Sequence, residues 1–143
     1  MQKKTEDTNK QTETLNHKPK IESEVAIRIT MMPRDTNSHG TVFGGIILSY
    51  IDVAGGVEAV RRSGHDRFVT VAMKEIIFLE PVFIGDLVSF YAETTKVGNS
   101  SISVRVIVEA ERTGSVGQSI RVTEAEVTYV AINQYREKVK IGK

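Results

Sequence analysis

The sequence predicts an α+β domain in which a curved antiparallel sheet wraps around one long central helix. Two patterns predict this class. Residues 42–63 carry apolar side chains at helical spacing, whereas the segments before and after them alternate between apolar and polar residues with the period of two that is typical of strands. Because a helix and a sheet that are each apolar on one side must cover each other, this arrangement is the simplest one.

One strand is expected before the helix and four after it. The first lies in IESEVAIRIT (21–30), and the later four are expected over residues 68–80, 86–97, 101–112 and 119–133. Gly64 is expected to end the helix, because glycine readily adopts the left-handed conformation that is common at helix C-termini. Arg61 and Arg62 suit the negative end of the helix dipole. KVGNSS (96–101) predicts a tight hairpin turn.

Length and composition narrow the possible functions. The 143 residues suffice for one domain of ordinary size, and the formal net charge of +1 gives no basic surface for nucleic acid. The absence of cysteine excludes disulfides, thiol nucleophiles and zinc–thiolate sites, and it fits a cytoplasmic location. No apolar run reaches the roughly 18 residues that a membrane-spanning helix needs. The polar residues 1–21 predict a disordered tail without a secretory signal, followed by one folded domain over residues 22–143.

Asp52 is the main candidate for chemistry because it interrupts an apolar helix. The sequence contains no phosphate-binding loop, no dinucleotide fingerprint and no nucleophile elbow, and its three histidines are scattered, so a metal site is not expected. Between Phe43 and Val57 the only polar side chains are Ser49, Tyr50 and Asp52. A carboxylate on such a helix is costly unless it is paired or open to water. Asp52 therefore either meets a counter-ion or a subunit boundary, or it lines a site.

Two features near Asp52 support a site. Gly44 and Gly45 weaken the helix start by roughly 1 kcal/mol each relative to alanine, but they let another group approach the free backbone N–H groups, which could hold a developing oxyanion. These glycines could instead only permit tight packing. Asn37, in the loop before the helix, could cap the helix or shape a turn, or it could orient a water molecule or a carbonyl group.

Several stretches of the sequence together resemble one known family. MMPRDTNSHGTVFGGIILSYIDVAGG (31–56) resembles the signature of hot-dog-fold acyl-CoA thioesterases, in particular the YciA-like acyl-CoA thioester hydrolases. VTVAMKEIIFLEPVFIGDLV, KVGNSSISVRVIVE and TEAEVTYVAIN follow in the family's order, so the resemblance covers residues 22–133. It implies the hot-dog fold, an acyl-CoA substrate and hydrolysis of its thioester. It also implies dimers that share a continuous sheet, commonly assembled into hexamers as trimers of dimers.

The resemblance also implies roles for individual residues. Asp52 matches the catalytic carboxylate, Asn37 matches an asparagine that reaches across the dimer interface, and Gly45 matches a glycine that donates its backbone N–H to the thioester carbonyl. The same resemblance implies substrate contacts for Thr70, Asn99, Ser100 and Ser101, and Gly44 is expected to contact the substrate because it lies beside Gly45 at the helix start. Some relatives have basic residues where Asn99 and Ser103 stand, so other cations are expected to contact the coenzyme A phosphates, among them Arg61, Arg62 or Lys96. His39 is expected to pack in its loop or to face solvent.

These roles predict a mechanism. Backbone N–H groups at the helix start would bind the carbonyl oxygen, and Asp52 would act as a general base on a water molecule that Asn37 holds; direct attack by Asp52 is the alternative. A thiolate leaving group needs little acid assistance because its pKa is about 8.5, and no cofactor is expected. Two other functions suit a hot-dog domain, namely an acyl-CoA-binding sensor and a hydratase or dehydratase of acyl thioesters. The hydratase would need a histidine on the helix, which this sequence lacks.

Overall fold

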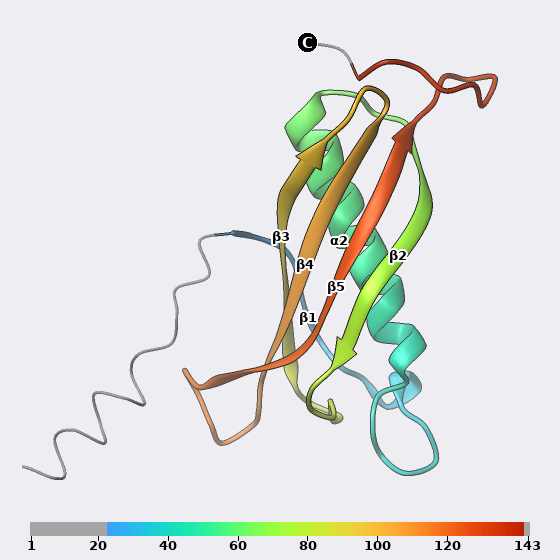
Figure 1. The fold of residues 1–143 in the computed structure, drawn as a ribbon. Coiled ribbons are helices and arrows are strands. Elements are labelled where there is room, and N and C mark those ends of the chain that lie inside the picture. Colours follow the sequence, from blue (N-terminus) through green and yellow to red (C-terminus); the bar gives the residue numbers. More distant parts are fainter. Residues whose placement is uncertain (1–22, 142–143) are drawn as a thin grey trace, which may run out of the picture.

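The computed structural model describes residues 23–141, so the predicted tail lies outside the described residues. Along the chain the elements are β1 (Glu24–Thr30), the short 3-10 helix η1 (Pro33–Asp35), α2 (Gly44–Ser63), β2 (Phe68–Phe78), β3 (Leu87–Val97), β4 (Ser101–Glu111) and β5 (Ser119–Ala131) (Figure 1). The predicted order of one strand, one long helix and four strands is confirmed. Gly64, with a φ of 72°, ends α2 in the left-handed conformation, as predicted.

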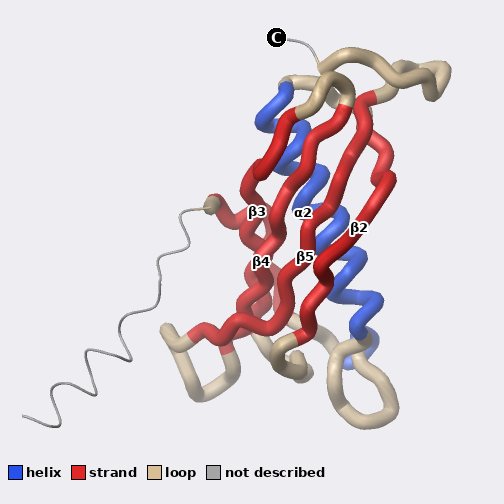
Figure 2. Tube along the Cα trace, viewed as in Figure 1, coloured by secondary structure: helices blue, strands red, loops and turns tan. Residues whose placement is uncertain are grey.

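The five strands form one antiparallel sheet in the order β1-β3-β4-β5-β2. The predicted hairpin turn joins β3 to β4, and there the N–H of Gly98 donates to the carbonyl of Ser101 at 2.7 Å. In contrast, β2 and β3 follow each other in the chain but are not neighbours in the sheet. Figure 2 shows that α2 runs along one face of the sheet, whose two edges are formed by β1 and β2.

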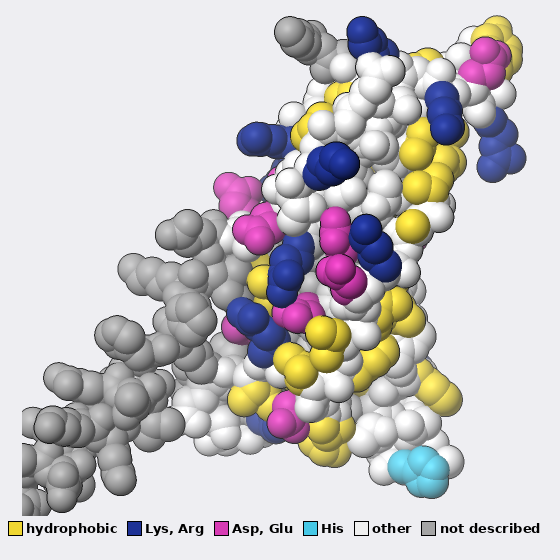
Figure 3. All heavy atoms as spheres, viewed as in Figure 1, with side chains coloured by type: hydrophobic (Ala, Val, Ile, Leu, Met, Phe, Trp, Pro, Cys, Tyr) yellow, Lys and Arg dark blue, Asp and Glu magenta, His cyan; other side chains and the backbone are white. Residues whose placement is uncertain are grey.

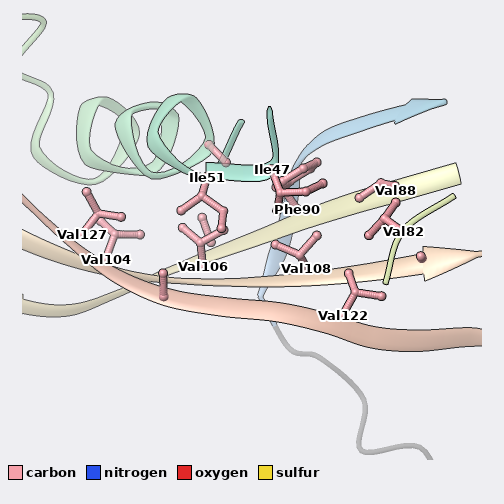
Figure 4. Close-up of a cluster of buried hydrophobic side chains, with 14 of the residues drawn as sticks. Ile47, Ile51, Val82, Val88, Phe90, Val104, Val106, Val108, Val122 and Val127 are labelled. Atoms are coloured by element: carbon pink, nitrogen blue, oxygen red, sulfur yellow. The ribbon is translucent and has the colours of Figure 1, made fainter. Parts of the chain in front are cut away.

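The hydrophobic core fills the space between α2 and the inner face of the sheet. Ile47 and Ile51 of α2 point toward the strands, as Figure 4 shows. The predicted alternation in the last two strands is confirmed by the inward side chains of Ile102, Val104, Val106, Val108, Thr123, Ala125, Val127 and Tyr129, all of which are buried. Each large apolar side chain buried in this way stabilises the fold by roughly 1.5–3 kcal/mol.

The opposite side of α2 is not covered by other parts of residues 23–141. Val53 and Val60 are 57% and 39% exposed, although the sequence pattern groups both with an apolar stripe. We call this surface the uncovered face of α2, and it consists of Gly45, Ser49, Asp52, Val53, Gly56 and Val60. Within residues 23–141 the sheet therefore covers only one side of α2. No helix within residues 23–141 is long and apolar enough to cross a membrane.

The connection from β2 to β3, residues 79–86, is fixed by the side chain of Arg112. Its Nη2 donates to the carbonyl of Pro81 at 2.6 Å, and its guanidinium lies 4.8 Å from the centre of the Phe83 ring. Its Nε is 3.6 Å from Oδ2 of Asp86, a buried carboxylate that also accepts the N–H of Phe83 at 2.9 Å. These contacts hold the connection in one position beside the start of α2.

Candidate active site

Asp52 lies on α2 where the edge strand β2 passes the helix. Its Oδ1 accepts a hydrogen bond of 2.6 Å from the hydroxyl of Thr70, which is on β2. The side chain of Asp52 is only partly buried, so its other carboxylate oxygen can meet water or a substrate. The structure therefore brings together Asp52 and Thr70, two of the residues that the sequence selected, although they are 18 positions apart.

Tyr129 of β5 also contacts the Asp52 region, and sequence reasoning did not select it. Its hydroxyl donates to the backbone carbonyl of Asp52 at 2.6 Å. A Cβ atom at Gly55 would collide with this hydroxyl, so the glycine is what lets the tyrosine approach the helix. Burial raises the pKa of Tyr129 well above its ordinary value, and the nearby charge of Asp52 raises it further. Tyr129 therefore stays a protonated donor that fixes the helix backbone at Asp52.

The two glycines at the helix start have different surroundings. A Cβ atom at Gly44 would lie 3.3 Å from the ring of Phe78, so Gly44 permits tight packing against β2. Among residues 23–141, a Cβ atom at Gly45 would have no neighbour within 4 Å, and no side chain caps this end of the helix. Gly45 precedes Asp52 by seven residues, which places both on one face of α2, about 10 Å apart along its axis. The free N–H groups of the first turn are thus open to a ligand on the side that carries Asp52.

Asn37 does not meet Asp52 within one chain. Its Oδ1 accepts the backbone N–H groups of His39 at 2.8 Å and Thr41 at 3.2 Å, and its Nδ2 donates to Oγ1 of Thr41 at 2.8 Å. Each of these bonds stays inside the loop of residues 37–41, and His39 is exposed there. Asp52 lies a further 12 Å or so beyond the helix start along the axis of α2. Within the chain, Asn37 thus shapes a turn, which was one of the two roles that its residue type suggested.

The residues selected for coenzyme A lie near the other end of α2. Asn99 is at the tip of the β3–β4 hairpin and lines a cavity of about 310 Å³ together with Arg62 and Lys140. The remaining lining residues are Ser63, Val97, Gly98, Ile102 and Ile141. Arg61 instead forms an exposed ion pair with Glu24 at 3.3 Å. Lys140, seven residues beyond the last predicted strand, was not selected, because nothing in the sequence distinguishes it from its neighbours Lys138 and Lys143.

A second cavity, of about 260 Å³, opens beside the start of α2. Its lining is mainly apolar and comes from the helix start, the end of β2, the connection to β3 and one residue of β5: Val42, Gly44, Ile47, Phe78, Leu79, Glu80, Pro81, Val82 and Thr123. We call it the helix-start cavity. Gly44 lines it, so the cavity adjoins the first-turn N–H groups of α2.

Comparison with known proteins assigns the family. Residues 39–117 match the family model described as the Thioesterase superfamily. The chain belongs to this superfamily. The match includes α2, β2, β3 and β4, and therefore Asp52, Thr70 and Gly45.

Individual members of the superfamily resemble the chain over most of its length. The acyl-CoA thioester hydrolase YciA of Salmonella typhimurium is 38% identical over 122 residues, which are 84% of this chain and 90% of that protein. Cj0915, a hexameric hotdog fold thioesterase of Campylobacter jejuni, is 45% identical with a TM-score of 0.77, over 83% of this chain and 90% of that one. HI0827, a hexameric broad specificity acyl-coenzyme A thioesterase, is 35% identical with a TM-score of 0.78. The match covers 85% of this chain and 82% of HI0827. The resemblance and the hot-dog fold predicted from the sequence are confirmed.

Proposed function

We propose that the protein hydrolyses acyl-CoA thioesters to a free carboxylic acid and coenzyme A. One observation carries this proposal: Asp52, held by Thr70, lies on the same face of α2 as the open backbone N–H groups at Gly45. A carboxylate that can act on water and a set of donors for an oxyanion are the two parts that hydrolysis of a thioester needs. The similar superfamily members that are named for an activity are acyl-CoA thioester hydrolases.

The proposed reaction uses these parts in order. The thioester carbonyl oxygen accepts N–H groups at the helix start, where each good donor stabilises the tetrahedral state by roughly 3 kcal/mol. Asp52 takes a proton from water while the water oxygen bonds to the carbonyl carbon. The carbon–sulfur bond then breaks, and coenzyme A leaves as a thiolate whose pKa of about 8.5 makes acid assistance unnecessary. Because water and the chain's own groups supply each step, the proposal requires no cofactor.

Thr70 orients the carboxylate in this proposal. Its hydroxyl occupies Oδ1 of Asp52 at 2.6 Å, which leaves Oδ2 as the oxygen that faces water. Direct attack of Asp52 on the thioester would instead form a mixed anhydride. In a single turnover in ¹⁸O-labelled water, an acid product without ¹⁸O would identify an anhydride that water opens at the Asp52 carboxyl carbon, because only this route transfers an oxygen of Asp52 to the acid.

We also propose that the protein forms dimers through β2, assembled further into hexamers as trimers of dimers. β2 is an edge strand whose backbone lacks a neighbour on one side within residues 23–141. Apolar side chains are exposed along it and just beyond its end, as Figure 3 shows for this side of the molecule, and they are Val71, Ile76, Ile77, Phe78 and Leu79. Exposed apolar patches of this kind mark interfaces. The similar solved structures Cj0915 and HI0827 are described as hexameric.

Such a dimer would complete the proposed site. The uncovered face of α2 carries Asp52 beside β2, so a partner paired on the β2 edge would lie next to Asp52. Asn37 does not reach Asp52 within its own chain, because its side chain is engaged in the loop of residues 37–41. We therefore propose that Asn37 acts at the Asp52 of the partner subunit.

A cytoplasmic location, expected from the sequence, stays a prediction.

The phosphates of coenzyme A are proposed to bind near Arg62 and Lys140. Both cations line the cavity of about 310 Å³ at the β3–β4 hairpin, together with Gly98 and Asn99 of its turn. Arg61, although next in the sequence, is occupied by Glu24. Ser103, which stands where some relatives have lysine, contributes no charge and pairs with Thr128 at 3.1 Å.

Replacing Arg62 with alanine is expected to raise the KM for an acyl-CoA by roughly 5- to 10-fold with little change in kcat, because one charge-assisted contact to a phosphate is lost. This increase in KM should be smaller at high salt, because salt screens the attraction between the cation and the phosphate. Arg61→Ala is the matched control, since Arg61 is also exposed but its cation forms an ion pair with Glu24. An S-acyl pantetheine, which lacks the nucleotide phosphates, should be hydrolysed equally by both variants. Equal effects of the two substitutions on the acyl-CoA would contradict the assignment.

The proposed activity is tested by mixing the protein with a panel of acyl-CoAs and measuring both released thiol and free acid. Hydrolysis releases the two in equal amounts. A sensor would bind the panel without turnover, and a hydratase would change the acyl group without releasing thiol. Either of these results would contradict the proposed function.

A further inference from the structure

Thr70 and Tyr129 are partners across two neighbouring strands, and both donate a hydrogen bond to the same residue of α2. Their Cα atoms are paired in the register of β2 and β5. The hydroxyl of Thr70 donates to the carboxylate of Asp52, and the hydroxyl of Tyr129 donates to the backbone carbonyl of Asp52, each at 2.6 Å. The side chain and the main chain of Asp52 are thus both tied to one position of the sheet.

The sheet sets the directions of these two side chains. The register of β2 and β5 shifts directly after the pair, between Thr70 and Ala72. Shifts of this kind re-aim side chains and are over-represented next to active sites. The ring of Tyr129 packs edge-on against the ring of Phe68, with 6.5 Å between the two ring centres. The pair is therefore oriented by its own strands and not by the helix that it contacts.

α2 carries a glycine where the hydroxyl of Tyr129 approaches it. Gly55 lies within the helix, where glycine is less favourable than alanine. A Cβ atom at Gly55 would collide with the hydroxyl of Tyr129 and would lie 3.0 Å from its ring. Phenylalanine would fill the same part of the core without needing a hydrogen-bond partner. Core packing therefore explains the ring of Tyr129 but not its hydroxyl.

We propose that Tyr129 is a positioning residue for hydrolysis, which acts through the main chain of Asp52 to hold the carboxylate where it takes the proton of water. This inference rests on the proposed hydrolysis of acyl-CoAs. Asp52 lies on the uncovered face of α2, and Gly55 and Gly56 follow in the next turn, so the sheet has to hold this part of the helix from behind. Displacing a catalytic group by about 1 Å can reduce a rate by about 10²-fold.

The alternative is that Tyr129 only ties the helix to the sheet. Such a tie would contribute to stability and have no specific effect on kcat. The hydroxyl of Thr94 on β3 forms a tie of this kind, because it donates at 3.0 Å to the carboxylate of Glu58 on α2, away from Asp52. The two explanations therefore differ in which of these ties affects kcat.

The experiment measures kcat and KM for one acyl-CoA by thiol release in Tyr129→Phe, with Thr94→Val as the control. We expect Tyr129→Phe to lower kcat by about 10-fold and to leave KM within about 2-fold of the wild-type value, because the carboxylate moves while the substrate contacts stay. Thr94→Val should keep the wild-type kcat. Melting curves and size-exclusion chromatography establish that each variant folds and assembles.

Two double substitutions separate positioning of Asp52 from a general loosening of the helix. In the Asp52→Asn background, Tyr129→Phe should lower the residual rate by less than about 2-fold, because no carboxylate is left to position. Gly55→Ala should lower kcat at least as much as Tyr129→Phe, since its Cβ atom displaces the hydroxyl. Adding Tyr129→Phe to Gly55→Ala should then cause little further loss. Gly55→Ala alone tests the inference if Tyr129→Phe fails to assemble.

A Tyr129→Phe or Gly55→Ala variant with the wild-type kcat would overturn the inference. So would equal losses of kcat in Tyr129→Phe and Thr94→Val, or an equally large effect of Tyr129→Phe with and without the carboxylate of Asp52. Each of these results would leave the proposed hydrolysis standing. A wild type that releases thiol from no acyl-CoA would instead contradict the proposed function, and this inference with it.

Discussion

Asp52→Asn is expected to lower kcat for acyl-CoA hydrolysis by about 10³-fold or more, with the fold and assembly unchanged. General-base catalysis contributes roughly 10²- to 10⁴-fold, and an amide can neither accept the proton of water nor attack the thioester. Asparagine keeps the shape of the side chain and an oxygen that can accept the hydroxyl of Thr70. Asp52→Ala should abolish turnover as well. Thiol release measures kcat, while circular dichroism and size-exclusion chromatography check the fold and the assembly.

Asp66→Asn is the control for this prediction. Asp66 is exposed in the segment between α2 and β2, so its replacement removes the same charge without touching the helix. It should keep wild-type kcat. If Asp52→Asn hydrolyses acyl-CoAs at a rate close to that of the wild type, Asp52 is only a surface carboxylate bonded to Thr70, and the proposed mechanism is wrong.

Asn37→Ala is expected to reduce kcat by about 10²-fold, because the water molecule at the partner's Asp52 loses the amide that holds it. The same substitution removes three hydrogen bonds from the loop of residues 37–41, which could by itself disturb the site. Asn37→Asp separates the two effects. Its carboxylate can still accept the N–H groups of His39 and Thr41, but it offers no amide donor. We expect Asn37→Asp to lose activity as strongly as Asn37→Ala.

Thr41→Val completes this series, because it removes one of the loop bonds while leaving the amide of Asn37 in place. It should cost less than 10-fold in kcat, on the scale of one hydrogen bond. A near-normal rate for Asn37→Asp, together with a slow Thr41→Val, would assign Asn37 to turn formation alone.

Residue patterns in the sequence predicted the elements of the fold, because they repeat over many positions. The period of two in residues 101–111 and 119–131 predicts that alternate side chains lie on opposite faces of the sheet. Val104 and Val127 are buried, as this pattern predicts. The strand order could not be predicted, since nothing local indicates that β2 crosses to pair with β5. Nor does the sequence of α2 indicate whether an apolar face of the helix is covered by the sheet of the same chain or by another subunit.

The candidate site was predictable where the residue type was unusual for its surroundings. Asp52 stood out in an apolar helix, and Gly45 stood out as a helix residue with poor propensity. Tyr129 did not stand out, because an inward-facing residue on a strand looks like ordinary core. Its significance depends on what it faces, namely the backbone carbonyl of Asp52. This contact follows only from how β5 packs against α2.

A mixture of Asp52→Ala and Asn37→Ala subunits tests the central claim most directly, which is that each active site combines Asp52 of one subunit with Asn37 of its partner. The two variants are unfolded together in equal amounts and refolded, and thiol release from an acyl-CoA is measured. If partners pair at random, half of the dimers contain one subunit of each kind. One of the two sites in such a dimer then has both wild-type residues, so the account predicts about a quarter of the wild-type activity. Activity no greater than the mean of the two variants refolded separately would contradict it.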